Sequence, residues 1–213
     1  MNSPEMYVDN KIIPRLTLSG DSVREETIRH HLRRYELAQS YIASDSVAVD
    51  LCCGTGYGTG MLKSAGARCA IGVDLSHDAI EFASSEYGHT GSVYIRDSVI
   101  DFLSDMPQYP DVITFFEAIE HIPREDGERI IDAARQSISE DGVFLLSTPR
   151  DIRSDVNPDH ITQWSYGELS EMLHKKFGKV DLFGQDWSTG QFVYGDIASQ
   201  SSFFVAVCSE PLR

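Results

Sequence analysis

The 213-residue chain lacks most features that disulfide-bonded, membrane-spanning or nucleic-acid-binding proteins need. Its four cysteines show no CxxC spacing, so we expect neither a disulfide framework nor a zinc site. This cysteine usage leads us to expect a protein of the reducing cytoplasm. No apolar run approaches the roughly 18 residues of a membrane span, and the first residues lack the apolar core of a signal peptide. Only 18 lysines and arginines face 33 acidic residues, and a net charge of −15 disfavours general nucleic-acid binding.

What is present is the composition of an ordinary globular protein, with 41% hydrophobic and 24% charged residues. The length suits one domain over residues 1–213. Residues 1–20 contain two prolines and show no period, so we expect an irregular lead-in. Residues 21–43 have apolar residues at helical spacing, and Asp21 is suited to cap that helix.

From residue 47 onward, apolar strand segments alternate with helical segments. This alternation predicts an α/β fold with a parallel sheet covered by helices on both faces. The segment 185–200 is expected to be a loop before the last strand. The predicted strands are 47–51, 69–73, 93–95, 111–116, 143–147, 180–183 and 203–207. One predicted helix follows the glycine turn and ends at residue 62, a second begins at about residue 76, and two more cover residues 124–137 and 166–177.

The segment VAVDLCCGTGYGTG, residues 47–60, joins a buried strand to a helix through a glycine turn. Gly54 and Gly56 permit backbone angles that a Cβ would forbid, and they let a ligand lie against the chain. A plain glycine turn is the alternative reading. A dinucleotide-binding GxGxxG motif would need glycine at position 59, where threonine stands, which disfavours an NAD-dependent enzyme.

Three acids follow three successive predicted strands: Asp50, Asp74 and Asp97. Open α/β sheets bind ligands at this carboxyl edge. A carboxylate at Asp74 is suited to accept hydrogen bonds from both ribose hydroxyls, and one at Asp97 from an adenine amino group. Each acid alone is more typical of a turn or a helix cap, but the three together favour a nucleoside site.

The glycine segment 50–58, the motif IGVDLS at 71–76 and the segment 114–122 resemble class I S-adenosylmethionine (SAM)-dependent methyltransferases. The resemblance implies a Rossmann-like, seven-stranded, mostly parallel sheet with helices on both faces and an antiparallel last strand. It also implies SAM as the cofactor, with residues 1–43 covering its site. Cys52 departs from the usual glycine or alanine, and its small size is expected to be tolerated. The implied cofactor-binding residues are Tyr35, Asp50, Cys52, Gly54, Gly56, Asp74, Leu75, Asp97, Ser98 and Glu117, with Arg34 beside Tyr35 closing over the site.

Two narrower resemblances concern the acceptor side. The segments FFEAIEHI, STP and NPDH, together with His31 and Arg34-Tyr35, resemble small bacterial methyltransferases associated with sugar or cell-surface glycan modification. The motif Glu117-x-x-Glu120-His121 with a later Asp159-His160 and Trp164 resembles the small-RNA 3′-terminal 2′-O-methyltransferases. In that family two glutamates and two histidines hold a divalent cation, which implies the metal ligands Glu117, Glu120, His121 and His160 here.

The positions of these residues support a cluster independently of the resemblance. Glu117 follows the fourth strand, and a helical turn starting there would bring Glu120 and His121 to its side. His160 comes from the loop after the adjacent strand. Carboxylates and imidazoles suit Mn²⁺, Fe²⁺ or a similar ion, with Mn²⁺ or Mg²⁺ as the expected metals. In the alternative reading Glu117 binds the substrate or the SAM amino group, and His121 is the general base.

The sequence thus predicts an enzyme that transfers the methyl group of SAM to a hydroxyl of a small molecule, preferably a sugar or glycan. His121, Glu117 and His160 are the expected catalytic residues. The alternatives are an enzyme like the RNA 3′-terminal 2′-O-methyltransferases and a non-catalytic SAM-binding regulatory protein. The retained cluster speaks against the regulatory protein, because cofactor binding alone does not need it. His30, His77, His89 and His174 are expected to be solvated.

Overall fold

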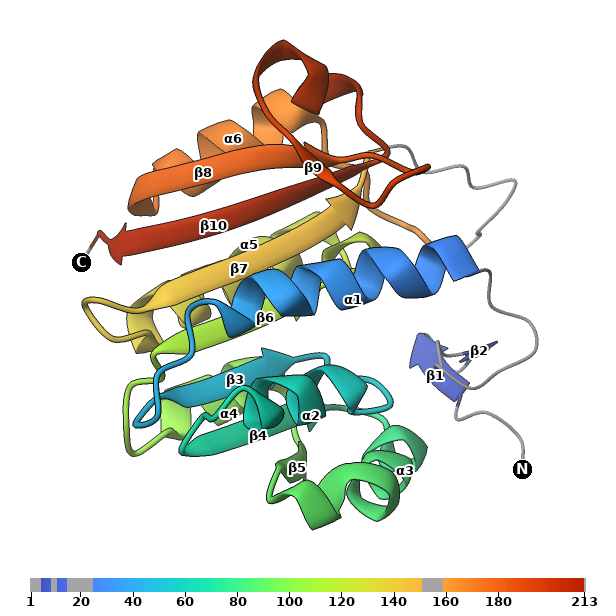
Figure 1. The fold of residues 1–213 in the computed structure, drawn as a ribbon, viewed down its shortest axis with the longest axis vertical. Coiled ribbons are helices and arrows are strands. Elements are labelled where there is room, and N and C mark those ends of the chain that lie inside the picture. The colour runs from blue at the N-terminus through green and yellow to red at the C-terminus, as the bar shows by residue number, and fades with distance from the viewer. Residues whose placement is uncertain (1–4, 9–10, 15–24, 151–158, 213) are drawn as a thin grey trace.

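The computed structural model describes residues 5–8, 11–14, 25–150 and 159–212, and its centre is one eight-stranded sheet (Figure 1). The strand order is β5-β4-β3-β6-β7-β10-β8-β9. The strands of this sheet are β3 (Val47–Leu51), β4 (Cys69–Asp74), β5 (Val93–Arg96), β6 (Val112–Phe116), β7 (Val143–Pro149), β8 (Phe177–Gln185), β9 (Phe192–Val193) and β10 (Phe203–Pro211).

Strands β5, β4, β3, β6 and β7 run parallel to one another, and β10 runs antiparallel to both β7 and β8. This confirms the Rossmann-like, mostly parallel sheet and its antiparallel last strand. The chain order reverses between β3 and β6, so the switch point lies where β3 ends in Asp50-Leu51. Ligands of open α/β sheets bind at such a point.

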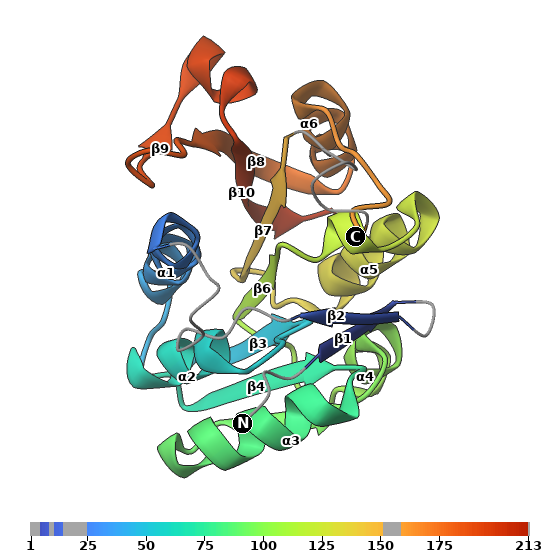
Figure 2. The same cartoon turned by 90° about the vertical axis from the view of Figure 1, so that its right-hand side faces the viewer.

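Helices cover both faces of the sheet, as predicted (Figures 1 and 2). Helices α1 and α2 lie on one face with α3 beside α2, and α4, α5 and α6 lie on the other. The helices are α1 (Glu25–Gln39), α2 (Tyr57–Ser64), α3 (His77–Tyr87), α4 (Val99–Asp105), α5 (Arg124–Ser137) and α6 (Tyr166–His174), with 3₁₀ turns at Gly88–Thr90, Ile119–His121 and Gly195–Gln200.

Each face of the sheet has its own buried apolar cluster. The larger includes Phe115, Phe144 and Ile131 and lies under α4, α5 and α6. The smaller includes Leu62 and Leu145 and lies under α1 and α2. Burial on both faces explains why the central strands are near-continuous apolar runs, which made them easy to predict.

Three regions of the chain contain elements that the sequence did not predict. Residues 5–8 and 11–14 form an antiparallel hairpin (β1, Glu5–Val8; β2, Lys11–Pro14) inside the expected irregular lead-in, and Asp21 lies outside the described residues. Helix α4 was not predicted; its seven residues are too few to show a clear helical period. The expected loop 185–200 contains β9, which pairs with β8, and a 3₁₀ turn.

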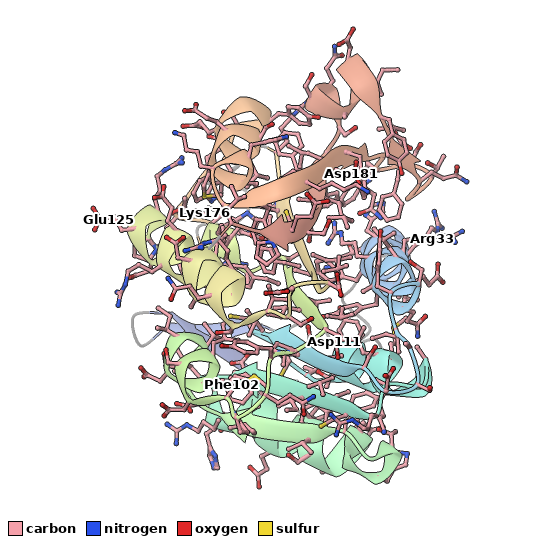
Figure 3. All side chains as sticks on the ribbon, turned by 90° about the vertical axis from the view of Figure 1, so that its left-hand side faces the viewer. Arg33, Phe102, Asp111, Glu125, Lys176 and Asp181 are labelled. Carbon is pink, nitrogen blue, oxygen red and sulfur yellow. The ribbon has the colours of Figure 1, made fainter. Side chains whose placement is uncertain are left out.

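Asp111 lies at the edge of the sheet where the parallel strands begin, and Figure 3 views the molecule from this edge. The Val47 amide donates to the Asp111 carboxylate at 2.9 Å, and the Asp111 amide donates to the Val47 carbonyl at 2.8 Å. The unpaired polar groups described below lie at the opposite, carboxyl edge. Among the described residues no helix is long and apolar enough to span a membrane.

Candidate active site

The glycine loop is organised around the buried carboxylate of Asp50, at the end of β3. Hydroxyl groups of three residues donate to it: Thr114 at 2.7 Å, Thr59 at 2.8 Å and Tyr35 at 3.1 Å. Burial raises the pKa of Asp50 to about 6, although these donors pull it down. The carboxylate therefore ties α1, α2 and β6 to the loop, and it shapes the site from within the protein.

The loop needs left-handed backbone angles at three positions. The φ angles are 54° at Cys52, 55° at Gly54 and 84° at Gly56. Glycine adopts such angles at little cost, whereas a residue with a Cβ pays roughly 1 kcal/mol or more. The unusual feature of Cys52 is therefore its backbone conformation as much as its size.

Helix α1 lies directly over the loop through Tyr35. A Cβ added at Gly58 would stand 1.9 Å from the Tyr35 ring, and the Tyr57 hydroxyl lies 2.8 Å from Nδ1 of His31 on α1. The Tyr35 ring also packs edge-on against Phe116 of β6. The predicted covering of this edge by α1 is consistent with these contacts.

The second acid, Asp74, is bound to the loop from the end of β4. The Gly54 amide donates to one of its carboxylate oxygens at 2.9 Å, and the Ser76 amide donates to the other at 2.9 Å. The neighbouring Leu75 is 69% exposed. An acceptor-rich carboxylate beside an exposed apolar side chain is an arrangement that suits a nucleoside.

Asp97 and Ser98 lie at the same edge, after β5. The Ser98 amide donates to the Asp97 carboxylate at 2.8 Å, and the Ser98 hydroxyl caps α4 by accepting from the Asp101 amide. Both residues therefore stand where the sequence predicted them, and both also have a local structural role.

Arg34 on α1 is a fully buried cation whose importance the sequence underrated. Its Nε donates to the Gln185 side chain at 2.9 Å, and one terminal nitrogen lies 3.2 Å from the Glu117 carboxylate. The guanidinium also lies 4.5 Å from the centre of the Phe203 ring. Neither terminal nitrogen makes a well-aligned hydrogen bond within the described part of the chain, although one of them is ion-paired with Glu117. A buried donor left this way is rare without a ligand.

Glu117, directly after β6, has a strained backbone with a φ of 49°. The Ser147 hydroxyl donates to its carboxylate at 2.9 Å, on the same oxygen that faces Arg34. Non-glycine residues hold such angles only where the surrounding structure imposes them, often at functional sites. Glu117 thus stands between the cofactor loop and the acceptor side.

Three of the four predicted metal ligands come together. Ligand atoms of Glu120, His121 and His160 all lie within 4.8 Å of one another, and no other such group of three or more occurs in the residues described. The rings of His121 and His160 meet edge-on, with centres 4.7 Å apart. The carboxylate of Glu117 is directed to Arg34 and Ser147 rather than into this group. The 3₁₀ turn begins at Ile119, after Glu117, so the helical turn that would align all four does not form.

The protonation states in this group suit a ligand site. His121 Nδ1 lies 3.0 Å from the Asp159 carbonyl, which only accepts, so Nδ1 carries the proton and Nε2 has a free lone pair. Burial lowers the pKa of His121, and burial with the nearby His121 lowers the pKa of His160 to about 4. Both imidazoles are therefore neutral near pH 7.

Glu120 is the acidic member of the group and is only 1% exposed. Burial, and then the charge of Glu117, raises its pKa well above the ordinary value. The Thr148 hydroxyl donates to it at 3.3 Å. A buried carboxylate beside two neutral imidazoles is a donor set that a small divalent cation would complete.

Two aromatic residues and a histidine border Arg34 on the side away from the loop. His30 is fully buried, which corrects the expectation that it is solvated: its Nε2 donates to the Trp187 carbonyl at 2.7 Å. The Trp187 and Phe203 rings stack with centres 5.8 Å apart. No sequence pattern indicated the His30–Trp187 contact, because the two residues are 157 positions apart.

The glycine loop at the switch point and the acids at the strand ends define a Rossmann-like methyltransferase fold. A family model described as a methyltransferase domain matches residues 23–184, so the chain belongs to this family of methyltransferase domains. This confirms the resemblance to class I SAM-dependent methyltransferases.

Individual relatives agree with this family. The ubiquinone biosynthesis O-methyltransferase of Yersinia enterocolitica is 30% identical over 116 residues, which are 54% of this chain and 47% of that protein. The chain thus matches about half the length of this curated relative. Among solved structures, a SAM-dependent methyltransferase from Archaeoglobus fulgidus has a TM-score of 0.67 at 17% identity, covering 87% of this chain and 94% of that one. The N-methyltransferase NodS from Bradyrhizobium japonicum with bound S-adenosylhomocysteine (SAH) has a TM-score of 0.68 at 15% identity, covering 92% and 95%.

Proposed function

We propose that the chain transfers the methyl group of SAM to a hydroxyl of a small molecule, with a sugar or glycan as the preferred acceptor class. The observation that carries this proposal is the group Glu120, His121 and His160 at the carboxyl edge, in the connection after β6 that begins with Glu117, which is ion-paired with Arg34. A protein that only bound SAM would not need this group.

The cofactor half of the site offers groups suited to the ribose, to the adenine, and to the carboxylate and amino group of the methionine part of SAM. Asp74 is suited to the ribose hydroxyls, and Asp97 to the adenine amino group. The terminal nitrogens of Arg34, one of which is ion-paired with Glu117, suit the methionine carboxylate, and Glu117 suits the methionine amino group. Each of these roles is assigned from charge and position.

The reaction is an in-line displacement. The acceptor oxygen forms a bond to the methyl carbon as the carbon–sulfur bond breaks, and the electron pair stays on sulfur to give neutral SAH. Since the sulfonium is already activated, the main task of the protein is alignment. The hydroxyl proton has to leave as the bond forms, and the lone pair of His121 Nε2 is suited to accept it.

The same residues fit Mn²⁺, with Glu120, His121 and His160 as the protein ligands, whereas Mg²⁺ prefers oxygen ligands. Such an ion, when bound, would lower the pKa of a coordinated hydroxyl. His121 would then be a ligand and not the base, so the two roles exclude each other. The closeness of the three donors and the two neutral imidazoles favour the ligand role.

A second acceptor class is favoured by the curated relative. Since that protein is named an O-methyltransferase of ubiquinone biosynthesis, a hydroxyl of a ubiquinone precursor is an alternative acceptor. An RNA 3′ end remains a weaker alternative, because the net charge of −15 opposes approach of a polyanion.

Labelled SAM offered with panels of sugars, phenols and short RNAs tests these alternatives directly. We expect the wild-type protein to transfer label to a sugar, giving an O-methyl sugar, and we expect no labelled product with His121→Ala. Transfer to phenols or RNA ends alone would replace the acceptor class. Tight SAH binding without transfer to any panel would instead support the regulatory protein.

A further inference from the structure

The residue that places His160 is not itself a ligand. His160 lies in the connection between β7 and α6, whereas Glu120 and His121 lie in the connection between β6 and α5. The group therefore exists only where these two connections are held in register. The contacts between them decide how the group is assembled.

The backbone of residues 159–162 is bonded to the 3₁₀ turn that carries Glu120 and His121. The amides of Ile161 and Thr162 both donate to the Glu120 carbonyl, at 2.8 and 3.0 Å. On the other side of His160, the Asp159 carbonyl accepts from His121 Nδ1 at 3.0 Å. His160 is thus bracketed by bonds to the two residues whose side chains it joins.

One side chain of this segment adds to the backbone bonds. The Thr162 hydroxyl donates to the Ile122 carbonyl at 2.6 Å, and Thr162 is buried. Below it, Trp164 is buried and its ring lies 4.0 Å from the Arg124 guanidinium at the start of α5. Thr162 therefore bonds to the middle of the 3₁₀ turn, through its amide to Glu120, and to the residue after the turn, through its hydroxyl to Ile122.

We propose that Thr162 is a positioning residue, whose hydroxyl sets His160 against Glu120 and His121. The proposal deepens the function proposed above and rests on it for its catalytic meaning. Residues that orient metal ligands typically change metal affinity about 10–100-fold when they are replaced. Thr162 would exert its effect through His160 without touching the cofactor loop.

The test compares Thr162→Val, which keeps the shape and loses the hydroxyl, with Thr162→Ser, which keeps the hydroxyl. Gln163→Ala is the matched control, because the Gln163 side chain donates to the Arg150 carbonyl and not to the 3₁₀ turn. Two quantities are measured on each protein with saturating SAH. The first is the nuclear Overhauser effect between the His121 and His160 rings without metal, and the second is the affinity for Mn²⁺ by electron paramagnetic resonance.

We expect Thr162→Val to lose the ring-to-ring signal and to bind Mn²⁺ about 10–100-fold more weakly. Thr162→Ser and Gln163→Ala should match wild type in both, and all variants should bind SAH equally. An unchanged signal and affinity in Thr162→Val would overturn the proposal, as would equal losses in Thr162→Val and Thr162→Ser. If the wild type binds no Mn²⁺, the metal part of the proposed function fails, and the ring-to-ring signal alone decides the role of Thr162.

Discussion

The two halves of the site differ in how completely the protein satisfies its own polar groups. On the cofactor side, Asp50 accepts from three hydroxyls and Asp74 from two backbone amides. On the acceptor side, Glu120 is buried and accepts from the Thr148 hydroxyl at 3.3 Å, which is a long hydrogen bond. The first half is a preformed shape, whereas the second half leaves a buried acid for a ligand to complete.

This difference suggests a division of work. A preformed loop binds a cofactor without reorganisation, which keeps affinity high. Buried unsatisfied groups destabilise the empty site but bind a matching ligand more strongly when water is excluded. Substitutions in the two halves should therefore separate into those that change SAM affinity or the fold and those that change turnover alone.

The largest effect is expected for His160→Ala. If the three grouped donors hold a metal, removing His160 should lower turnover by roughly 10²–10⁴-fold or more, because the ion that activates the acceptor hydroxyl is lost. Without a metal, His121 is the base, and His160→Ala should cost less. SAH affinity by calorimetry should stay at the wild-type value, because His160 does not contact the glycine loop. Added EDTA separates the two roles, since chelation should stop wild-type turnover only if a metal is held.

His174→Ala is the matched control, because His174 is an exposed histidine bonded within its own helix α6. It should retain full turnover. Full turnover in His160→Ala, with or without EDTA, would remove His160 from the mechanism and would weaken the division between the two halves.

How well the site could be predicted follows the same division. The glycine loop and Asp74 were found from sequence because the motif 47–60 carries its own geometry within fourteen residues. The contacts of Arg34 with Gln185 and of His30 with Trp187 join residues more than 150 positions apart, and no local pattern marks them. The group Glu120, His121 and His160 was anticipated from the positions of these residues and from a resemblance, yet the direction of Glu117 depends on a strained φ that sequence does not reveal.

The second prediction concerns stability on the cofactor side. Gly58→Ala places a Cβ 1.9 Å from the Tyr35 ring, which is held between Phe116 and Tyr57. Overpacking of this kind typically costs about 1–3 kcal/mol and sometimes more, and we expect the upper end of this range. Urea unfolding measures it. Gly60→Ala is the control, since its Cβ would meet Tyr87 at 3.4 Å, and an equal loss there would show that α2 simply tolerates no alanine.

The fold as a whole was easier to predict than these contacts. Strands β3, β4, β6 and β7 are apolar runs closed by turns, and their order agrees with the resemblance. Helix α4 and strand β9 were missed because seven and two residues are too short for a periodic signal. Strand β8 begins at Phe177, where the sequence still indicated helix; the aromatic residue is buried in the sheet core instead.

The third prediction tests the cofactor role of Asp74. Asp74→Ala should weaken SAH binding by about 1.5–3 kcal/mol, which is roughly 10–150-fold, through lost hydrogen bonds to the charged carboxylate. Calorimetry measures the affinity. Asp78→Ala, an exposed acid in the first turn of α3, should bind as wild type. Wild-type affinity in Asp74→Ala would show that the ribose does not use this carboxylate.

The smallest expected effect concerns the energetic cost of burying the Asp50 carboxylate in the cofactor half of the site. Its pKa is raised to about 6 in the folded protein, against about 3.9 in an unfolded chain. The folded state therefore binds more protons between these values, so this group makes the protein more stable as pH falls from 7 to 5. The contribution is roughly 1 kcal/mol over that interval.

Asp50→Asn removes the titration but keeps a side-chain oxygen that can accept from Thr114. The difference in unfolding free energy between pH 5 and pH 7 should therefore be smaller in Asp50→Asn than in wild type, by roughly 1 kcal/mol. Comparing the two proteins cancels the other titrating groups, including the histidines with lowered pKa, which act in the opposite direction. Asp78→Asn should keep the wild-type difference. An identical pH dependence in Asp50→Asn would mean that the three hydroxyl donors fully offset the burial of Asp50, and that the cofactor half is shaped without strain.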